Sequence, residues 1–279
     1  MIHAATAVLL AALVLSGCAS VEPTLADPSG WVVQREFLQH RGRKIEILWA
    51  KPAAEGRRPA VLFIHGHQES NRNGGETYVR IGRLGTMARR GYVAAAISQP
   101  GYGNSEGPPD FCGPATQDAV LAALEHLRGK PFVDPDRVAV FGYSRGAVVA
   151  AMVATRDARL AGVVLGAGAY DFFTFYPTPM RGINMNISAE AGTSAAAFRA
   201  RSALHHADKI RAPVLILHGQ RDQRIPVEQA HAFAARLGAA GVPVSLKVFP
   251  NAAHSIPGED QYREVYPFLA RVLAGKSVE

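Results

Sequence analysis

Short apolar runs alternate along the chain with stretches that have helical periodicity. The apolar runs, rich in β-branched residues, lie near residues 31–38, 44–50, 60–65, 92–98, 137–142, 161–166, 213–218 and 243–249. Each predicts a strand. Helical spacing follows near residues 75–90, 115–129, 145–156, 227–240 and 260–274. Because strands that alternate with helices pair through crossover connections, the pattern predicts an α/β fold with a mostly parallel sheet of about eight strands, flanked by helices.

Two segments depart from this alternation. The first two strands are close together in sequence and predict an antiparallel hairpin. Residues 171–200 contain Pro177 and Pro179 and show little periodicity, although a direct crossover would need only about a dozen residues. We therefore expect one domain over residues 31–279, with a short cap-like insertion at 171–200 after the sixth strand.

The N-terminal residues have the pattern of a targeting segment. Residues 4–15 are apolar, too short a stretch to cross the ~30 Å hydrocarbon core but long enough for the apolar part of a signal peptide. The following Leu15-Ser16-Gly17-Cys18 resembles the lipobox of bacterial lipoproteins. That resemblance implies a signal peptide at 1–17, lipidation of Cys18, a tether at 18–30, and attachment to a membrane of the bacterial cell envelope.

Composition removes several classes of function. The chain has 279 residues, of which 48% are hydrophobic and 19% charged, as in globular proteins. Its net charge of +7 comes mostly from scattered arginines without aromatic interleaving, so a nucleic acid is not an expected partner. With only Cys18 and Cys112, we expect no disulfide. The usual zinc and dinucleotide motifs are missing from the sequence, so we expect neither a metal nor a cofactor.

A candidate nucleophile lies between a predicted strand and a predicted helix. Gly142-Tyr143-Ser144-Arg145-Gly146 fits the pattern G-x-S-x-G. Such a turn brings strand and helix backbones so close that the flanking positions need glycine. A serine on this turn also lies at a helix N-terminus, which favours developing negative charge.

A serine nucleophile needs a base, and the base needs an acid to orient it. Asp222 and His254 each follow a late strand within a few residues, in the order Ser, Asp, His. Asp171 and Asp208 are rival acids.

Cys112 is not on such a turn and is expected to be a buried residue without a catalytic role. His65 and His218, at strand ends, are expected to be structural or to line the site, and adjacent His205-His206 lack a third metal ligand at a useful spacing.

Three motifs together resemble known enzymes. GYSRG, the stretch HGQRDQRIP and the terminal FPNAAHS are similar to the catalytic domain of prolyl-oligopeptidase-type and dienelactone-hydrolase-type α/β-hydrolases, over about residues 45–275. The resemblance implies that Ser144 is the nucleophile, His254 the general base and Asp222 its orienting acid. It also implies that the backbone N–H groups of His67 and Arg145 form the oxyanion hole.

The chain departs from both of these families. Dienelactone hydrolases have a cysteine where this chain has Ser144, and true prolyl oligopeptidases carry a large additional N-terminal domain. We therefore expect a serine hydrolase that cleaves small or medium carboxylic esters, with a short-peptide peptidase as the alternative. A non-catalytic binding lipoprotein is the alternative from another class. The expected substrate pocket is aromatic, formed by Tyr143, Phe172, Phe173, Phe175 and Tyr176.

Overall fold

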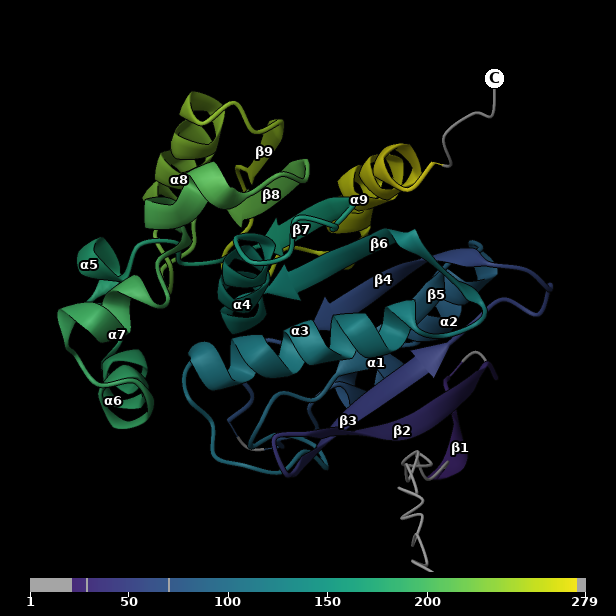
Figure 1. The fold of residues 1–279 in the computed structure, drawn as a ribbon. Coiled ribbons are helices and arrows are strands. Elements are labelled where there is room, and N and C mark those ends of the chain that lie inside the picture. The colour runs from purple at the N-terminus through teal and green to yellow at the C-terminus, as the bar shows by residue number, and fades with distance from the viewer. Residues whose placement is uncertain (1–21, 29, 70, 275–279) are drawn as a thin grey trace, which may run out of the picture.

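The computed structural model describes residues 22–28, 30–69 and 71–274 (Figure 1). Its strands are β1 (Glu22–Ala26), β2 (Val32–His40), β3 (Arg43–Ala50), β4 (Arg58–Ile64), β5 (Val93–Ile97), β6 (Val133–Tyr143), β7 (Gly162–Gly166), β8 (Val214–Gly219) and β9 (Val244–Phe249). Its helices are α1 (Glu76–Arg80), α2 (Arg83–Arg89), α3 (Pro114–Arg128), α4 (Arg145–Ala154), α5 (Phe172–Phe175), α6 (Arg181–Glu190), α7 (Ala195–Arg199), the 3₁₀ helix η1 (Ala203–Lys209), α8 (Glu228–Ala239) and α9 (Gly258–Val272).

All nine described strands form one sheet in the order β1-β2-β3-β5-β4-β6-β7-β8-β9. The pairs β1–β2, β2–β3 and β3–β5 are antiparallel, and the strands from β5 through β4 to β9 are parallel. The predicted α/β-hydrolase fold is therefore confirmed, as is the hairpin of β2 and β3. The strand beyond the predicted eight is β1, within the segment predicted as a tether, where residues 22–26 pair with β2.

The apolar side chains form two layers, one on each face of the sheet. Alternate residues of β4 point to opposite faces, as the pleat requires. Leu62 and Ile64 pack with apolar residues of α3, α4 and α8. Val61 and Phe63 pack with α1, α2 and α9 on the other face. This double burial explains why the parallel strands read as continuous apolar runs rather than as alternating ones.

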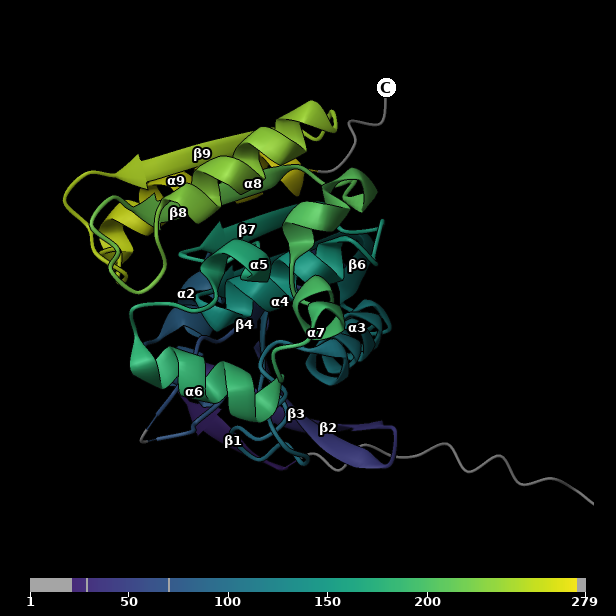
Figure 2. The same cartoon turned by 90° about the vertical axis from the view of Figure 1, so that its left-hand side faces the viewer.

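The segment predicted as one helix at 75–90 is two short helices. Gly82 separates α1 from α2 with a φ of 66°, a left-handed conformation that ends one helix before the next begins. The predicted insertion at 171–200 holds α5, α6 and α7, which its weak periodicity did not indicate. Figure 2 shows these three helices in front of the edge where the parallel strands end.

The predicted signal peptide at 1–17 and the predicted lipidation site Cys18 lie outside the described residues. Within the part of the chain that the structure describes, no helix is both long and apolar enough to cross a membrane.

Candidate active site

Ser144 occupies a strained turn between β6 and α4. Its φ of 55° and ψ of −121° place a residue with a side chain in a conformation that favours glycine. The two flanking glycines are required for the same turn. A Cβ on Gly142 would lie 2.0 Å from the carbonyl oxygen of Gly146, and one on Gly146 would lie 2.0 Å from that of Ile64. The G-x-S-x-G pattern therefore has a steric cause here.

Three side chains that are distant in sequence form a continuous hydrogen-bonded chain. Nε2 of His254 lies 2.9 Å from Oγ of Ser144, and Nδ1 of His254 lies 2.7 Å from Oδ2 of Asp222. Asp222 follows β8 and His254 follows β9, so neighbouring parallel strands deliver both residues to the edge where β6 delivers Ser144. With Nδ1 donating to the carboxylate, Nε2 is free to accept the hydroxyl proton of the serine.

Asp222 is held as a carboxylate by several donors. Its Oδ1 accepts the backbone N–H groups of Arg224 at 2.9 Å and Ile225 at 3.0 Å. His218, buried at the end of β8, lies 3.3 Å from Oδ2 through Nε2. Burial alone would raise the pKa of Asp222, but the hydrogen bonds from His218, His254 and Ile225 outweigh burial and hold the pKa well below its ordinary value. Asp222 is therefore an ionised carboxylate where it contacts Nδ1 of His254.

Tyr143, predicted in the substrate pocket, does not line the cavity beside Ser144 but braces the loop that carries His254. Its hydroxyl donates to the carbonyl oxygen of His254 at 2.7 Å and accepts the N–H of Ile256 at 2.9 Å. Burial raises the pKa of Tyr143 to about 12, so the hydroxyl keeps its proton. Tyr143 thereby fixes the backbone of the loop that carries His254.

The loop after β4 lies directly against the nucleophile. A Cβ on Gly66 would lie 3.2 Å from Cβ of Ser144, so only glycine lets the loop approach this closely. His65 fixes the loop from behind, because its Nε2 accepts the N–H of Gln99 at 3.1 Å and its Nδ1 donates to the carbonyl oxygen of Gly66 at 2.8 Å. Burial lowers the pKa of His65 to about 4, which keeps the ring neutral and able to accept. His67 and Arg145, the predicted oxyanion donors, both border the cavity that contains Ser144.

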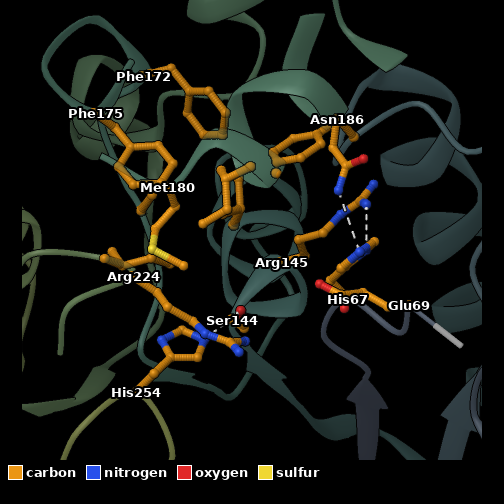
Figure 3. Close-up of a pocket in the computed structure, with 16 residues that line it drawn as sticks. His67, Glu69, Ser144, Arg145, Phe172, Phe175, Met180, Asn186, Arg224 and His254 are labelled. Carbon is orange, nitrogen blue, oxygen red and sulfur yellow. Dashed lines mark hydrogen bonds between the residues drawn. The ribbon is translucent and has the colours of Figure 1, made fainter. Parts of the chain in front are cut away.

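A largely apolar cavity opens beside Ser144 (Figure 3). It encloses about 730 Å³, counting the part open to solvent. Phe172 and Phe175 line it as predicted. Phe173 and Tyr176 do not line it. Phe173 is partly exposed to solvent and its ring contacts those of His205 and Phe198. Tyr176 packs on Phe198. The lining residues that sequence analysis missed are Glu69, Phe111, Val148, Ala169, Met180, Gly182, Ile183, Asn186, Arg224 and Ile225.

Helix α6 forms one wall of this cavity and is bonded to the core at two points. Glu190 at its end lies 2.6 Å from Nη2 of Arg145, with both side chains largely buried. Asn186 lies 3.4 Å from Nε2 of His67, whose Nδ1 accepts from Nη1 of Arg145 at 3.1 Å (Figure 3). The sequence carried one signal for the pair of Arg145 and Glu190. Arg145 directly follows Ser144, and an arginine buried at that place needs an acidic partner.

The rival acids and the second cysteine lie away from this chemistry. Asp171 caps α5 through the N–H of Phe173 and lies 3.1 Å from His205, and Asp208 is exposed on η1. Cys112 is buried as predicted, with Sγ donating to the carbonyl oxygen of Arg145 at 3.3 Å. Burial raises the pKa of Cys112 to about 11, which keeps it as an unreactive thiol.

A serine, a histidine and an aspartate joined in this order at the carboxyl edge of this sheet define a serine hydrolase of the α/β-hydrolase fold. The comparison with family models narrows the class. The model of the prolyl oligopeptidase family, Peptidase_S9, matches residues 79–276. The chain belongs to this family.

Relatives in sequence carry peptidase names. The chain is 28% identical over 228 residues to the uncharacterised peptidase YtmA of Bacillus subtilis, covering 80% of this chain and 86% of YtmA. It is 27% identical over 209 residues to dipeptidyl-peptidase 5 of Porphyromonas gingivalis, covering 70% of this chain and 30% of that protein. The chain thus spans most of YtmA but under a third of the dipeptidyl peptidase.

Solved structures share the fold. A puromycin-hydrolyzing peptidase of Mycobacterium tuberculosis superposes with a TM-score of 0.77 at 23% identity, covering 87% of this chain and 39% of that one. Acetyl xylan esterase 1 of Thermoanaerobacterium superposes with a TM-score of 0.71 at 17% identity, covering 92% of this chain and 88% of the esterase. The names of the sequence relatives favour the peptidase alternative over the esterase that sequence analysis preferred.

Proposed function

We propose that this serine hydrolase is a peptidase that cleaves short peptides after an apolar residue. The observation that carries the proposal is the hydrogen-bonded chain from Ser144 through His254 to Asp222, at 2.9 and 2.7 Å. Its place in a family whose sequence relatives are named peptidases supports the peptide over the ester.

The proposed reaction is an acylation of Ser144 followed by hydrolysis. Oγ of Ser144 bonds to the carbonyl carbon while His254 takes the hydroxyl proton. The oxygen that becomes negative faces the backbone N–H groups of His67 and Arg145. His254 then gives its proton to the nitrogen as the C–N bond breaks, and the amine leaves. Water, activated by the same histidine, releases the acyl group and restores Ser144.

The cavity beside Ser144 fits the residue on the acyl side of the bond. Its wall is mostly apolar, from Phe172, Phe175, Met180, Ile183 and other side chains. An apolar side chain gains about 25 cal/mol for each Å² that it buries there. Arg224 and Glu69 also line the cavity and supply charged groups that can bind polar atoms of a peptide backbone. This combination favours an apolar residue with a polar main chain attached.

The closing experiment compares two substrate panels on the same enzyme. We expect faster hydrolysis of anilides of short peptides with Phe, Leu or Ala before the bond than of anilides with Asp or Lys there. Matched p-nitrophenyl acyl esters report whether the triad works at all. Hydrolysis of the esters with no cleavage of any peptide would leave the esterase and reject the peptidase.

The role of Ser144 has its own test. A fluorophosphonate reagent should label the wild type and not Ser144→Ala, and activity of the variant should fall by about 10⁴-fold or more. Equal labelling of both proteins would remove Ser144 from the mechanism.

For the N-terminal segment we propose attachment to the cell envelope through lipid on Cys18. The support is the sequence Leu15-Ser16-Gly17-Cys18 after an apolar stretch at 4–15. When the full chain is expressed in a bacterium, it should take up labelled palmitate and partition with membranes. Cys18→Ala should do neither, and label in that variant would reject the site.

A further inference from the structure

A second groove shares the loop after β4 with the candidate site. Gly66 and His67 on that loop, Tyr143 beside the nucleophile, and Ser255 and Ile256 after the base all line it. It encloses about 930 Å³, counting the part open to solvent. His67 lines both this groove and the apolar cavity, so the two hollows meet at the loop after β4.

The position of this groove fits the leaving group. In the proposed reaction the acyl part and the leaving amine extend from the carbonyl carbon in different directions. The amine must take its proton from His254, so it leaves beside the loop that carries this residue. His254 itself lines the first cavity together with the cap helix α6, and the next two residues of its loop, Ser255 and Ile256, line the second groove.

Arg83, at the N-terminus of α2, also lines the groove. Its guanidinium lies 3.5 Å from the centre of the Tyr262 ring, and Nη1 donates to the hydroxyl of Tyr266 at 3.4 Å. Nε is buried and makes no hydrogen bond to any residue that the structure describes. Two aromatic residues of α9 thus hold the side chain in place, and at least one of its N–H groups has no acceptor among the described residues.

No carboxylate among the described residues forms an ion pair with Arg83. The acidic residues in the first turn of α9, Glu259 and Asp260, lie 3.4 and 3.9 Å from the guanidinium of Arg263. Glu76 on α1 is bound by Arg35 and Arg80. A partly buried guanidinium that is fixed by stacking and lacks an acidic partner is suited to bind a carboxylate from a ligand.

We propose that the second groove binds the leaving group and that Arg83 binds a carboxylate on it. The substrates of this site are then short peptides whose free C-terminal carboxylate lies shortly after the cleaved bond. This inference rests on the proposed function, and it adds a requirement at the far end of the substrate. The apolar cavity selects the residue before the bond, and Arg83 selects where the chain ends.

The test compares substrates that differ only in the carboxylate. Peptides with the same sequence and one, two or three residues after the cleaved bond are prepared as free acids and as C-terminal amides. For the wild type we expect kcat/KM of the best free acid to exceed that of its amide by about tenfold. In Arg83→Gln the ratio should fall close to one, and Arg83→Lys should restore part of it.

Arg271→Gln is the matched control, because Arg271 is a cation on α9 that stacks on Phe268 at 5.5 Å, toward the other end of the helix. It should keep the ratio of the wild type. A ratio near one in the wild type, or an equal loss on acid and amide in Arg83→Gln, would overturn the proposal. The second result would assign Arg83 a purely structural role.

Esters separate this inference from the proposed function. Acyl esters of 4-hydroxyphenylpropionic acid and of its amide also differ only in a carboxylate on the leaving group. Their hydrolysis requires no peptidase activity. If neither set of peptides is cleaved while these esters are, the peptidase assignment fails and the ester pair decides the role of Arg83. A preference for the acid that Arg83→Gln removes would support the anionic subsite, and its absence would reject it.

Discussion

The carboxylate of Glu190 lies 2.6 Å from the guanidinium of Arg145, the residue directly after Ser144. The pair links the cap helix α6 to the turn that carries the nucleophile. Arg145 also donates to Nδ1 of His67 and to the hydroxyl of Tyr102, both at 3.1 Å. The wall of the apolar cavity and His67 on the loop after β4 are therefore fixed by the same guanidinium.

Breaking this pair should affect both stability and substrate binding. Glu190→Gln leaves the cation of Arg145 buried without a charged partner, which we expect to lower the free energy of unfolding by about 2 kcal/mol. As α6 loosens, kcat/KM for substrates with a large apolar residue before the bond should fall about tenfold. Chemical denaturation and a substrate series with increasing acyl size measure the two effects.

Glu259→Gln provides the control for Glu190→Gln. Glu259 is 87% exposed and its ion pair with Arg263 is long, at 3.4 Å. We expect a change in stability below about 0.5 kcal/mol, because exposed pairs contribute little. If Glu190→Gln behaves like this control, the Arg145–Glu190 pair does not hold the cap helix.

Removing the hydroxyl of Tyr143 should slow the reaction without weakening substrate binding. Tyr143→Phe keeps the ring, which packs on Gly166, but loses the hydrogen bonds to the carbonyl of His254 and the N–H of Ile256. We expect kcat to fall about tenfold with KM within twofold, since a small displacement of the base affects the chemical step. Slower labelling by a fluorophosphonate would show the same defect.

The matched variant for this prediction is Tyr176→Phe. Its hydroxyl lies 3.2 Å from Ser188 in the exposed part of the insertion, and the side chain does not line the cavity. We expect unchanged kinetics. An increase in KM without a fall in kcat in Tyr143→Phe would reject the bracing role and would assign the hydroxyl to substrate binding, as sequence analysis predicted for this residue.

The three residues that sequence analysis expected to meet, and that the structure brings together, share one property. Ser144, Asp222 and His254 each follow a strand of the parallel sheet closely, and parallel strands end at one edge. Local patterns therefore specify their meeting point. The roles of Tyr143 and Glu190 depend on contacts across 111 and 45 residues, respectively, and no local pattern encodes such contacts.

The cavity wall was only partly predictable for a related reason. Phe172 and Phe175 lie one helical turn apart on α5 and face the cavity, whereas Phe173 points away from it. Without an expected helix at this place, the three aromatic residues could not be told apart. The 10-residue helix α6 was also not predicted, since only Ile187 on it is buried.

A methyl group on Gly146 should prevent folding. The Cβ of Gly146→Ala would lie 2.0 Å from the carbonyl oxygen of Ile64, and backbone atoms of β4 cannot move aside without breaking the sheet. We expect a loss of more than about 4 kcal/mol, seen as a failure to accumulate folded protein. Gly238→Ala is the matched control, because a Cβ there has no neighbour within 4 Å and α8 should gain up to about 1 kcal/mol in stability. Normal folding of Gly146→Ala would refute the close approach of α4 to β4.

His65 should make the stability of the protein depend on pH between about 4 and 6.5. Burial lowers the pKa of His65 from 6.5 to about 4, so in this range the unfolded chain binds a proton that the folded protein refuses. Stability contributed by the neutral ring is complete above pH 6.5 and is lost as the pH falls toward 4, by up to about 3 kcal/mol.

His65→Gln cannot titrate, so its free energy of unfolding should lie below that of the wild type at pH 7.5, with a gap that narrows as the pH falls. Urea denaturation of both proteins at pH 7.5, 6, 5 and 4.5 measures the gap. A constant gap would mean that His65 is accessible to protons in the folded protein and does not fix the loop after β4 as a neutral acceptor.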